Sequence, residues 1–144
     1  MLRIESELNG RYAHYGQLRD KICQHGFCIG SNWEFDYGSF DTKIFYDSEE
    51  GETIYLRMPF EVMRGMMDDY NTIIRFFDPY VIKHLVHVGL DHDGSSFIDA
   101  TGFSQFQTPI DTDAPIINKN KWVHVSEKLV RDSVLPFVSD ENIY

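Results

Sequence analysis

Hydrophobic residues along the chain change their spacing twice, from a helical period to a strand period and back. Over residues 12–25, apolar side chains recur every three or four positions, which is the spacing of one helix face. Over residues 27–90 they alternate with polar side chains, which is the period of a half-buried strand. A second helical stripe covers residues 122–137. The pattern therefore predicts a helix, a series of strands and a final helix.

The segment 32–47 holds the densest aromatic cluster of the chain and predicts a β-hairpin. Its turn is expected at Asp36-Tyr37-Gly38-Ser39, because Asp and Gly favour tight turns between two alternating runs. We expect Trp33, Phe35 and Phe40 to be core residues. This hairpin would then begin the sheet.

Further strands are predicted at 53–60, 71–77, 81–90 and 96–101. Pro59 is expected to end the first of these, because proline cannot donate a ladder hydrogen bond. Consecutive hairpins make a sheet antiparallel, and two amphipathic helices of this size cover one of its faces. The predicted fold is a single α+β domain over residues 1–144, with 139–144 as a frayed tail. It has a curved antiparallel sheet of five to six strands, with an N-terminal and a C-terminal helix packed on one face.

Composition and charge narrow the classes of partner. The 144 residues are 42% hydrophobic and 15% aromatic, as in a globular chain rather than a disordered one. The formal net charge is −10, and the thirteen Lys and Arg residues are scattered singly. Such a chain repels phosphate backbones and anionic membrane surfaces. Nucleic acid and membrane are therefore not expected as partners.

The cysteines and the absence of long apolar runs indicate a cytoplasmic location. No run approaches the roughly 20 apolar residues that span a bilayer, and the N-terminus lacks the apolar stretch of a signal peptide. In reducing cytoplasm, Cys23 and Cys28 would be free, half-buried thiols. Their spacing is not that of a redox pair or a zinc knuckle. We expect no disulfide and no metal at these positions.

The sheet face opposite the helices is the first candidate site. If the helices cover Ile54, Leu56, Ile74 and Phe76, alternation places a second set of side chains on the other face: Tyr55, Arg57, Ile73, Arg75, Phe77, Leu85 and His87. This set is too apolar for a wholly solvated surface. The favoured interpretation is a homodimer interface centred on Ile73, Phe77 and Leu85, because extended apolar patches commonly mark protein contacts. The alternatives are cover by the 102–121 loop and a groove in which Tyr55, Arg57, Arg75 and His87 hold a small anion.

Histidines and aspartates gather near the end of the strand at 81–90: His84, His87 and His92 with Asp91 and Asp93. Imidazole and carboxylate groups this close suggest a metal. On a strand, however, His84 and His87 lie an odd number of residues apart and face opposite sides of the sheet. We place His84 on the helix-covered face, and we expect no metal and no cofactor.

Signatures of catalysis are absent from the sequence. It contains no nucleophile elbow, no HExxH and no glycine-rich phosphate loop. Asp36 and Asp41 could converge as paired carboxylates, but aspartates at turn edges usually cap backbone groups. The long segment 102–121 is a candidate loop, in which Phe103, Gln105 and Phe106 form either a recognition lid or a fixed cover of the sheet.

Four stretches, spread over nearly the whole chain, share the order and spacing of one family's motifs. They are Phe27-x-Ile29-Gly30-x-Asn32-Trp33-x-Phe35-Asp36-x-Gly38-x-Phe40-Asp41-x-Lys43-Ile44, Leu56-Arg57-x-Pro59-Phe60, His87-Val88-Gly89-Leu90-Asp91 and Phe103-Ser104-Gln105-Phe106-Gln107-x-Pro109-Ile110-Asp111. In these motifs the chain resembles the YugN-like family of small proteins from Bacillus-type bacteria. The resemblance implies an α+β fold with an antiparallel sheet and a cytoplasmic location. Because the family's activity is unassigned, it implies no catalytic residues.

The sequence thus predicts a non-enzymatic cytoplasmic interaction domain that forms a homo-oligomer through its uncovered sheet face. The alternative is a small protein that binds an anionic ligand on that same face. The two differ in whether Arg57 and Arg75 are available to a ligand.

Overall fold

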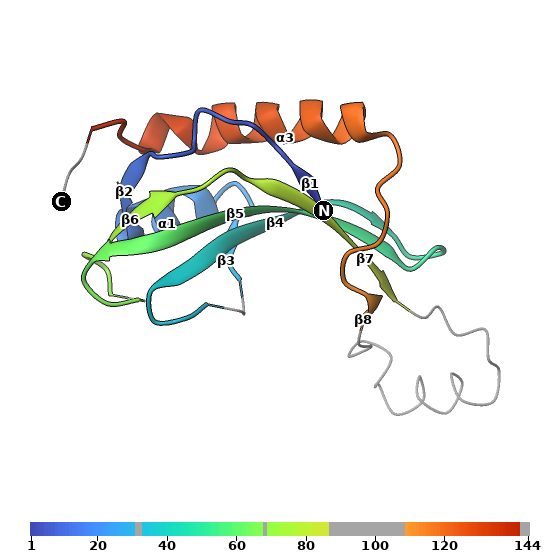
Figure 1. Ribbon diagram of the computed structural model, residues 1–144, viewed down its shortest axis with the longest axis horizontal. Coiled ribbons are helices and arrows are strands. Elements are labelled where there is room, and N and C mark those ends of the chain that lie inside the picture. Colours follow the sequence, from blue (N-terminus) through green and yellow to red (C-terminus); the bar gives the residue numbers. More distant parts are fainter. Residues whose placement is uncertain (31–32, 68, 87–108, 142–144) are drawn as a thin grey trace.

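The chain folds into an open antiparallel sheet with two α-helices (Figure 1). The structure is a computed structural model that describes residues 1–30, 33–67, 69–86 and 109–141. No helix of the described chain is long and apolar enough to cross a membrane. The strands are β1 (Leu2–Arg3), β2 (Tyr12–His14), β3 (Cys28–Ile29), β4 (Tyr37–Asp47), β5 (Glu52–Arg64), β6 (Ile73–Phe76), β7 (Tyr80–Val86) and β8 (Pro109–Asp111), and the helices are α1 (Tyr15–Cys23), α3 (Lys119–Ser133) and the short 3-10 helix η2 (Leu135–Phe137).

The sheet is organised around β5, its longest strand at 13 residues. On one side, β4 pairs with β5 from Asp47 back to Tyr37. On the other side, β7 pairs with the first half of β5 and β6 with the second half, so that β6 and β7 lie end to end. Short strands complete the outer edges, because β2 pairs with β6, β1 and β8 pair with β7, and β3 pairs with β4.

The antiparallel sheet and its two helices are as predicted, but the strand count is not. The described residues form eight strands rather than five to six. The additional strands are two or three residues long, and β1 and β2 come from the N-terminal segment. Segments this short carry no alternating pattern, so their pairing partners decide whether they are strands.

One face of the sheet is the hydrophobic core. Ile54, Leu56, Met58 and Phe60 alternate along β5 and each is at most 1% exposed. The rings of Tyr15, Phe40, Phe60 and Phe76 pack on one another with centroids 5.3–6.4 Å apart. Fully burying a side chain of this size stabilises the fold by about 1.5–3 kcal/mol.

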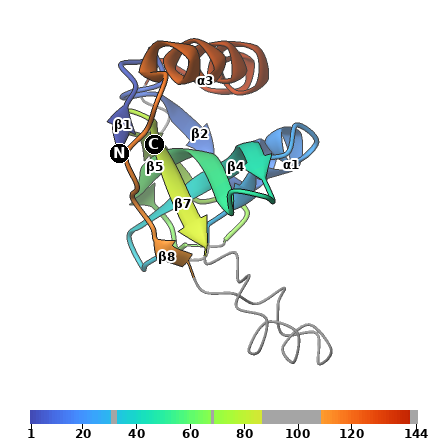
Figure 2. The same cartoon turned by 90° about the vertical axis from the view of Figure 1, so that its right-hand side faces the viewer.

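The two helices contribute to the same core without forming a common layer. In Figures 1 and 2, α3 lies above the sheet and α1 lies beside it. Leu18 and Ile22 of α1, and Trp122 and Val130 of α3, belong to one buried cluster. The prediction that an N-terminal and a C-terminal helix both pack on one face of the sheet is therefore corrected. The apolar side chains of the curved sheet are covered by α3 from above and by α1 from the side.

The predicted turn of the first hairpin lies too late in the chain. The β4 strand already begins at Tyr37, and the hydrogen bond from the Glu34 N–H to the Tyr37 carbonyl, 2.7 Å, closes a turn before it. Phe40 is fully buried as expected, but Trp33 and Phe35 are 49% and 73% exposed. Both rings belong to the connection rather than to a strand, so alternation does not apply to them.

Pro59 does not end its strand, because β5 continues through it to Arg64. The Pro59 carbonyl accepts a hydrogen bond from the Phe77 N–H, at 3.0 Å, on the side of β5 where β6 and β7 lie. In a strand, the N–H and C=O of one residue point to the same side, so the donor that proline lacks would face the break between β6 and β7. The missing hydrogen bond thus falls where the ladder is already interrupted.

The last helix and the tail also differ from expectation. The helix α3 begins at Lys119 and ends at Ser133, with Pro136 in the separate turn η2. Ser139 is not frayed, because its N–H and C=O exchange two hydrogen bonds with Tyr12 at 2.8 and 2.7 Å. The predicted strand at 96–101 lies outside the described residues.

Candidate functional site

The sheet face opposite the core carries most of the tyrosines of the chain, and we call it the tyrosine face. Cross-strand pairing aligns its side chains in rows: Tyr37–Glu61–Arg75–Tyr12, Asp41–Arg57–Tyr80–Arg3, Lys43–Tyr55–Ile82 and Tyr46–Thr53–His84. Five of the eight tyrosines of the sequence lie in these rows. Among the described residues, no helix covers this face (Figure 1).

The structure brings only part of the predicted site together. Tyr55, Arg57, Ile73 and Arg75 lie on the tyrosine face, and Phe77 is 40% exposed beside them. The prediction that Leu85 lies on this face is wrong, because Leu85 pairs with Glu52 on the core face of the sheet. His87 and the loop residues Phe103, Gln105 and Phe106 lie outside the described residues.

A one-residue bulge explains the error at Leu85. Two residues of β5 lie between Arg57 and Phe60, whereas three residues, 77–79, lie between their partners Phe76 and Tyr80. An extra residue in one strand reverses the facing of every later side chain. His84 therefore lies on the tyrosine face rather than on the helix-covered face.

A similar irregularity lies in β4. The register shifts between Lys43 and Phe45, so that Phe45 pairs with Ile54 on the core side. There the Phe45 ring contacts the Trp122 ring at 5.5 Å, whereas Tyr46 is 59% exposed. Strict alternation without the bulge would have placed Tyr46 on the core face and Phe45 on the tyrosine face.

The best-defined group on the tyrosine face is an ion pair between Arg57 and Asp41. The guanidinium Nε lies 3.1 Å from both carboxylate oxygens of Asp41, and Nη2 lies 3.0 Å from Oδ2. The Ser39 hydroxyl donates to the same carboxylate at 3.0 Å. Burial would lower the pKa of Arg57, but its hydrogen bonds to Asp41 and Tyr80 raise that pKa overall.

Gly30 lets β3 approach this ion pair closely. A Cβ at position 30 would lie 2.8 Å from the Ser39 hydroxyl oxygen and 2.9 Å from Asp41 Oδ2. No real side chain makes such contacts without displacing its neighbour. The Gly30 N–H donates to the Ser39 carbonyl at 2.8 Å, which holds the backbone in place.

Arg75 and Arg3 of this face also have carboxylate partners. Arg75 forms an ion pair with Glu61, its cross-strand neighbour, and hydrogen-bonds Tyr12. Arg3 donates two hydrogen bonds to Asp78, at 3.0 and 2.7 Å. All three arginines are therefore neutralised within the protein.

Tyr55 and His84 form an aromatic contact next to Arg57. Their ring centroids are 4.9 Å apart, and His84 follows Tyr80 and Ile82 along the same side of β7. Burial, and then the positive charge of Arg57, lower the pKa of His84 below its ordinary value. The imidazole is therefore neutral at pH 7 and can donate or accept a hydrogen bond.

Sequence reasoning missed the carboxylate partners and the full set of tyrosines. Asp41 was considered only as a turn residue or a catalytic carboxylate. One signal could have revealed it, since opposite charges directly across two predicted strands attract each other. Tyr12 could not have been found in this way, because β2 is only three residues long.

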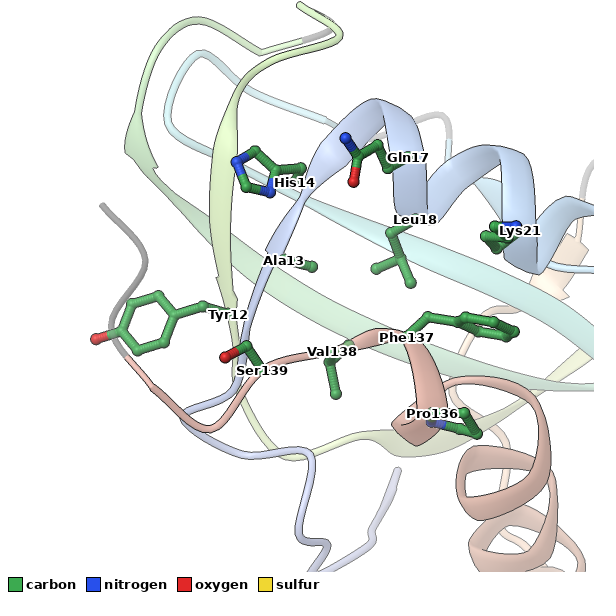
Figure 3. A pocket seen from close by; sticks show the side chains of 10 residues that line it. All are labelled: Tyr12, Ala13, His14, Gln17, Leu18, Lys21, Pro136, Phe137, Val138 and Ser139. Carbon is green, nitrogen blue, oxygen red and sulfur yellow. The ribbon is translucent and has the colours of Figure 1, made fainter.

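A cavity of about 370 Å³ lies elsewhere, between α1 and the C-terminal segment (Figure 3). Leu18 and Lys21 of α1 line one side, and Pro136 and Phe137 line the other. The two hydrogen bonds between Tyr12 and Ser139 close one end. Its lining contains one lysine and no carboxylate.

No group of three or more His, Cys, Asp or Glu residues within the described ranges could hold a metal ion. Of the histidines and aspartates considered near the end of the strand at 81–90, only His84 is among the described residues, and His87, Asp91, His92 and Asp93 lie outside those ranges. Cys23 and Cys28 are free and exposed rather than half-buried. Thus neither cysteine is packed in the core.

Comparison with known proteins points to one family. The model of the YugN-like family matches residues 3–135. A curated relative, "Uncharacterized protein YugN" of Bacillus subtilis (strain 168), is 28% identical over 116 residues, which are 81% of this chain and 84% of the relative. A crystal structure of "uncharacterized conserved protein YugN" from Geobacillus kaustophilus HTA426 is similar with a TM-score of 0.54 at 22% identity, over 92% of this chain and 97% of that chain. The structural likeness supports the fold, and none of the names states an activity.

Proposed function

The chain belongs to the YugN-like family, and we propose that it is a non-enzymatic interaction domain that associates with a second copy through its tyrosine face. One observation carries this proposal. Five tyrosines and three internally paired arginines share one sheet face that no described helix covers. We further propose a cytoplasmic location, because the exposed thiols of Cys23 and Cys28 are free.

The composition of the tyrosine face supports a protein partner. Tyrosine and arginine are enriched at protein interfaces and at the residues that dominate binding energy, whereas lysine is depleted there. Tyrosine supplies a large contact area for the cost of ordering few torsion angles. In the central rows, Tyr55 and Tyr80 flank the Arg57–Asp41 pair, so apolar contact surrounds a neutralised charge.

The charge distribution supports a second copy as that partner. Each protomer carries a formal net charge of −10, so two copies repel one another over most orientations. On the tyrosine face, Arg3, Arg57 and Arg75 balance Asp78, Asp41 and Glu61. Lys43 adds a positive charge to this face, so contact through it brings little negative charge together. A symmetric dimer would use the same patch of both copies as its interface.

Sedimentation velocity over a range of concentrations tests the proposal with two matched variants. Phe77 and Phe137 are 40% and 41% exposed, but only Phe77 adjoins the tyrosine face. We expect Phe77→Asp to raise the dimer dissociation constant at least about tenfold, because it places a carboxylate in the interface. Phe137→Asp introduces the same charge elsewhere and should leave the constant unchanged.

Ionic strength provides a second readout. Because the interface charges are paired while the protomers repel at long range, raising salt from about 0.05 to 0.5 M should strengthen the dimer by screening. A wild-type protein that stays monomeric at high concentration would refute the proposal. Equal weakening by both phenylalanine variants would also refute it.

The alternative, a small anionic ligand held by Arg57, Arg75, His87 and Tyr55, remains a prediction of lower rank. Both guanidiniums already bind a carboxylate, so a ligand would have to displace Asp41 or Glu61. A thermal-shift screen of acidic metabolites discriminates the two proposals. A ligand present at 100 times its Kd adds about 2.7 kcal/mol of stability, and only an anion held on the tyrosine face should lose this effect in the Arg57→Gln variant.

A further inference from the structure

A second and larger cavity lies between α3 and the outer edge of β4. Its volume is about 620 Å³, within the range of about 300–1,000 Å³ that is usual for ligand sites. β3 covers that edge of β4 only at Phe40 and Asp41, so β3 leaves the rest of the edge unpaired. The contact between Phe45 and Trp122 holds the first turn of α3 against β4.

One wall of the cavity is apolar and is formed by successive turns of α3. Val125 and Leu129 are four residues apart and therefore lie on the same side of the helix. Both are partly buried against the hydrophobic core, as is Ile44 of β4 across from them. These three side chains offer a continuous surface for an alkyl group.

The rim of the cavity is cationic, although the chain as a whole is acidic. Lys128, His25 and His124 line it, with Asp132 as the single carboxylate. Lys43 also borders the cavity, but its ammonium lies over the Tyr46 ring on the tyrosine face. His124 and Lys128 are one helical turn apart on the side of α3 next to the apolar wall. The Asp132 Oδ1 atom lies 3.8 Å from Arg131 Nε. Lys128 has no ion pair within the described part of the chain.

We infer that this cavity binds a small amphipathic anion, namely a carboxylate with a short alkyl body. The carboxylate lies at Lys128 and His124, where charge-assisted hydrogen bonds are available. The alkyl body lies against Val125, Leu129 and Ile44 and is removed from water. Neither half of such a molecule alone uses both surfaces, so the affinity requires the combination.

Isothermal titration calorimetry of the full chain tests this site with decanoate below its micellar concentration. We expect one decanoate per chain, with acetate and neutral decanamide binding at least about tenfold more weakly. Lys128→Gln should weaken decanoate binding about tenfold. Lys128→Arg should retain it, because the charge and the hydrogen-bond donors remain.

The matched control is Lys119→Gln, which removes the same charge from α3 outside the cavity lining. Equal weakening by Lys119→Gln and Lys128→Gln would reduce the effect to net charge and overturn the inference, as would the absence of decanoate binding. Co-sedimentation of the protein with phosphatidylglycerol vesicles would mean that it recognises the anionic headgroups of a bilayer rather than a free carboxylate. This result would also overturn the inference. The Phe77→Asp variant should bind decanoate as the wild type does. The proposal for this cavity and the proposal for the dimer are therefore tested separately.

Discussion

The two faces of β5 differ although their residues alternate along one strand. Leu56, Met58 and Phe60 are fully buried and belong to the hydrophobic core cluster that the sheet and the helices share. Tyr55, Arg57 and Glu61, which stand between or beside them, are partly exposed and take part in ring contacts and ion pairs. Adjacent residues of β5 thus have separate roles, with one set stabilising the fold and the other available for contacts with another molecule.

This difference shows why polar residues can occupy the centre of a sheet at little cost. Arg57 and Arg75 each have a carboxylate directly across the ladder, so neither charge is desolvated alone. On the core face, shape rather than charge decides the fit, because the interior is close-packed. Substitutions on the two faces should therefore have effects of different kinds as well as different sizes.

The largest effect is expected on the core face. Phe60→Ala removes a fully buried ring that contacts Tyr15, Phe40 and Phe76, and should lower the free energy of unfolding by about 3–5 kcal/mol in urea denaturation. The milder Phe60→Leu should remain folded and leave the dimer dissociation constant unchanged. A change in association without a loss of stability would contradict the separation of the two faces.

The Arg57–Asp41 pair should contribute less. Its side chains are 22% and 17% exposed, between the exposed and fully buried cases, so a coupling free energy of about 1–2 kcal/mol is expected. A double-mutant cycle with Arg57→Gln and Asp41→Asn measures it by urea denaturation. A coupling near zero would mean that the pair is no more than a solvated surface contact.

Gly30→Ala should displace the Arg57–Asp41 pair from the side of β3 and lower the free energy of unfolding by about 1 kcal/mol. The new methyl group would lie 2.8 Å from the Ser39 hydroxyl oxygen and 2.9 Å from Asp41 Oδ2, so one of them must shift. Cys28→Ala, at an exposed position of the same strand, serves as the control and should be neutral. Loss of the Arg57–Asp41 coupling in the Gly30→Ala background would identify the cause as displacement of Asp41.

The smallest expected effect is a pH dependence due to His84. Because its pKa is lowered in the folded state, the unfolded chain binds the proton more readily, at about pH 6.5. Stability should be complete above that pH and decrease as the pH falls through it. Urea denaturation between pH 7.5 and 5.5 measures the slope, which His84→Gln should reduce. An unchanged slope would assign the dependence to other groups.

The core of the sheet could be predicted closely from the sequence. The pattern around Ile54, Leu56 and Phe60 identifies the buried face of β5, because alternation is a local property of an extended chain. The helical stripes likewise predict α1 and α3. Periodicity does not explain the glycine at position 16, where the ring of Tyr70 occupies the space that a side chain would need.

The candidate site could be predicted only in part. Tyr55, Arg57 and Arg75 are on the predicted face, but their partners Asp41 and Glu61 come from pairing between strands. The aromatic residues Trp33 and Phe35 were predicted as core and are exposed. In both cases the outcome depends on where a strand starts and what lies across from it.

By itself, the sequence determined the family, the order of the two helices and the longer strands, and the buried face of β5, because hydrophobic periodicity and motif spacing need no knowledge of distant partners. The tertiary structure alone decided which face His84 and Leu85 occupy. It also decided that Arg3, Arg57 and Arg75 are neutralised by carboxylates. For His84 and Leu85 the physical reason is the extra residue between Phe76 and Tyr80. It is accommodated only because β5 pairs with both flanking strands, and it reverses every side chain that follows.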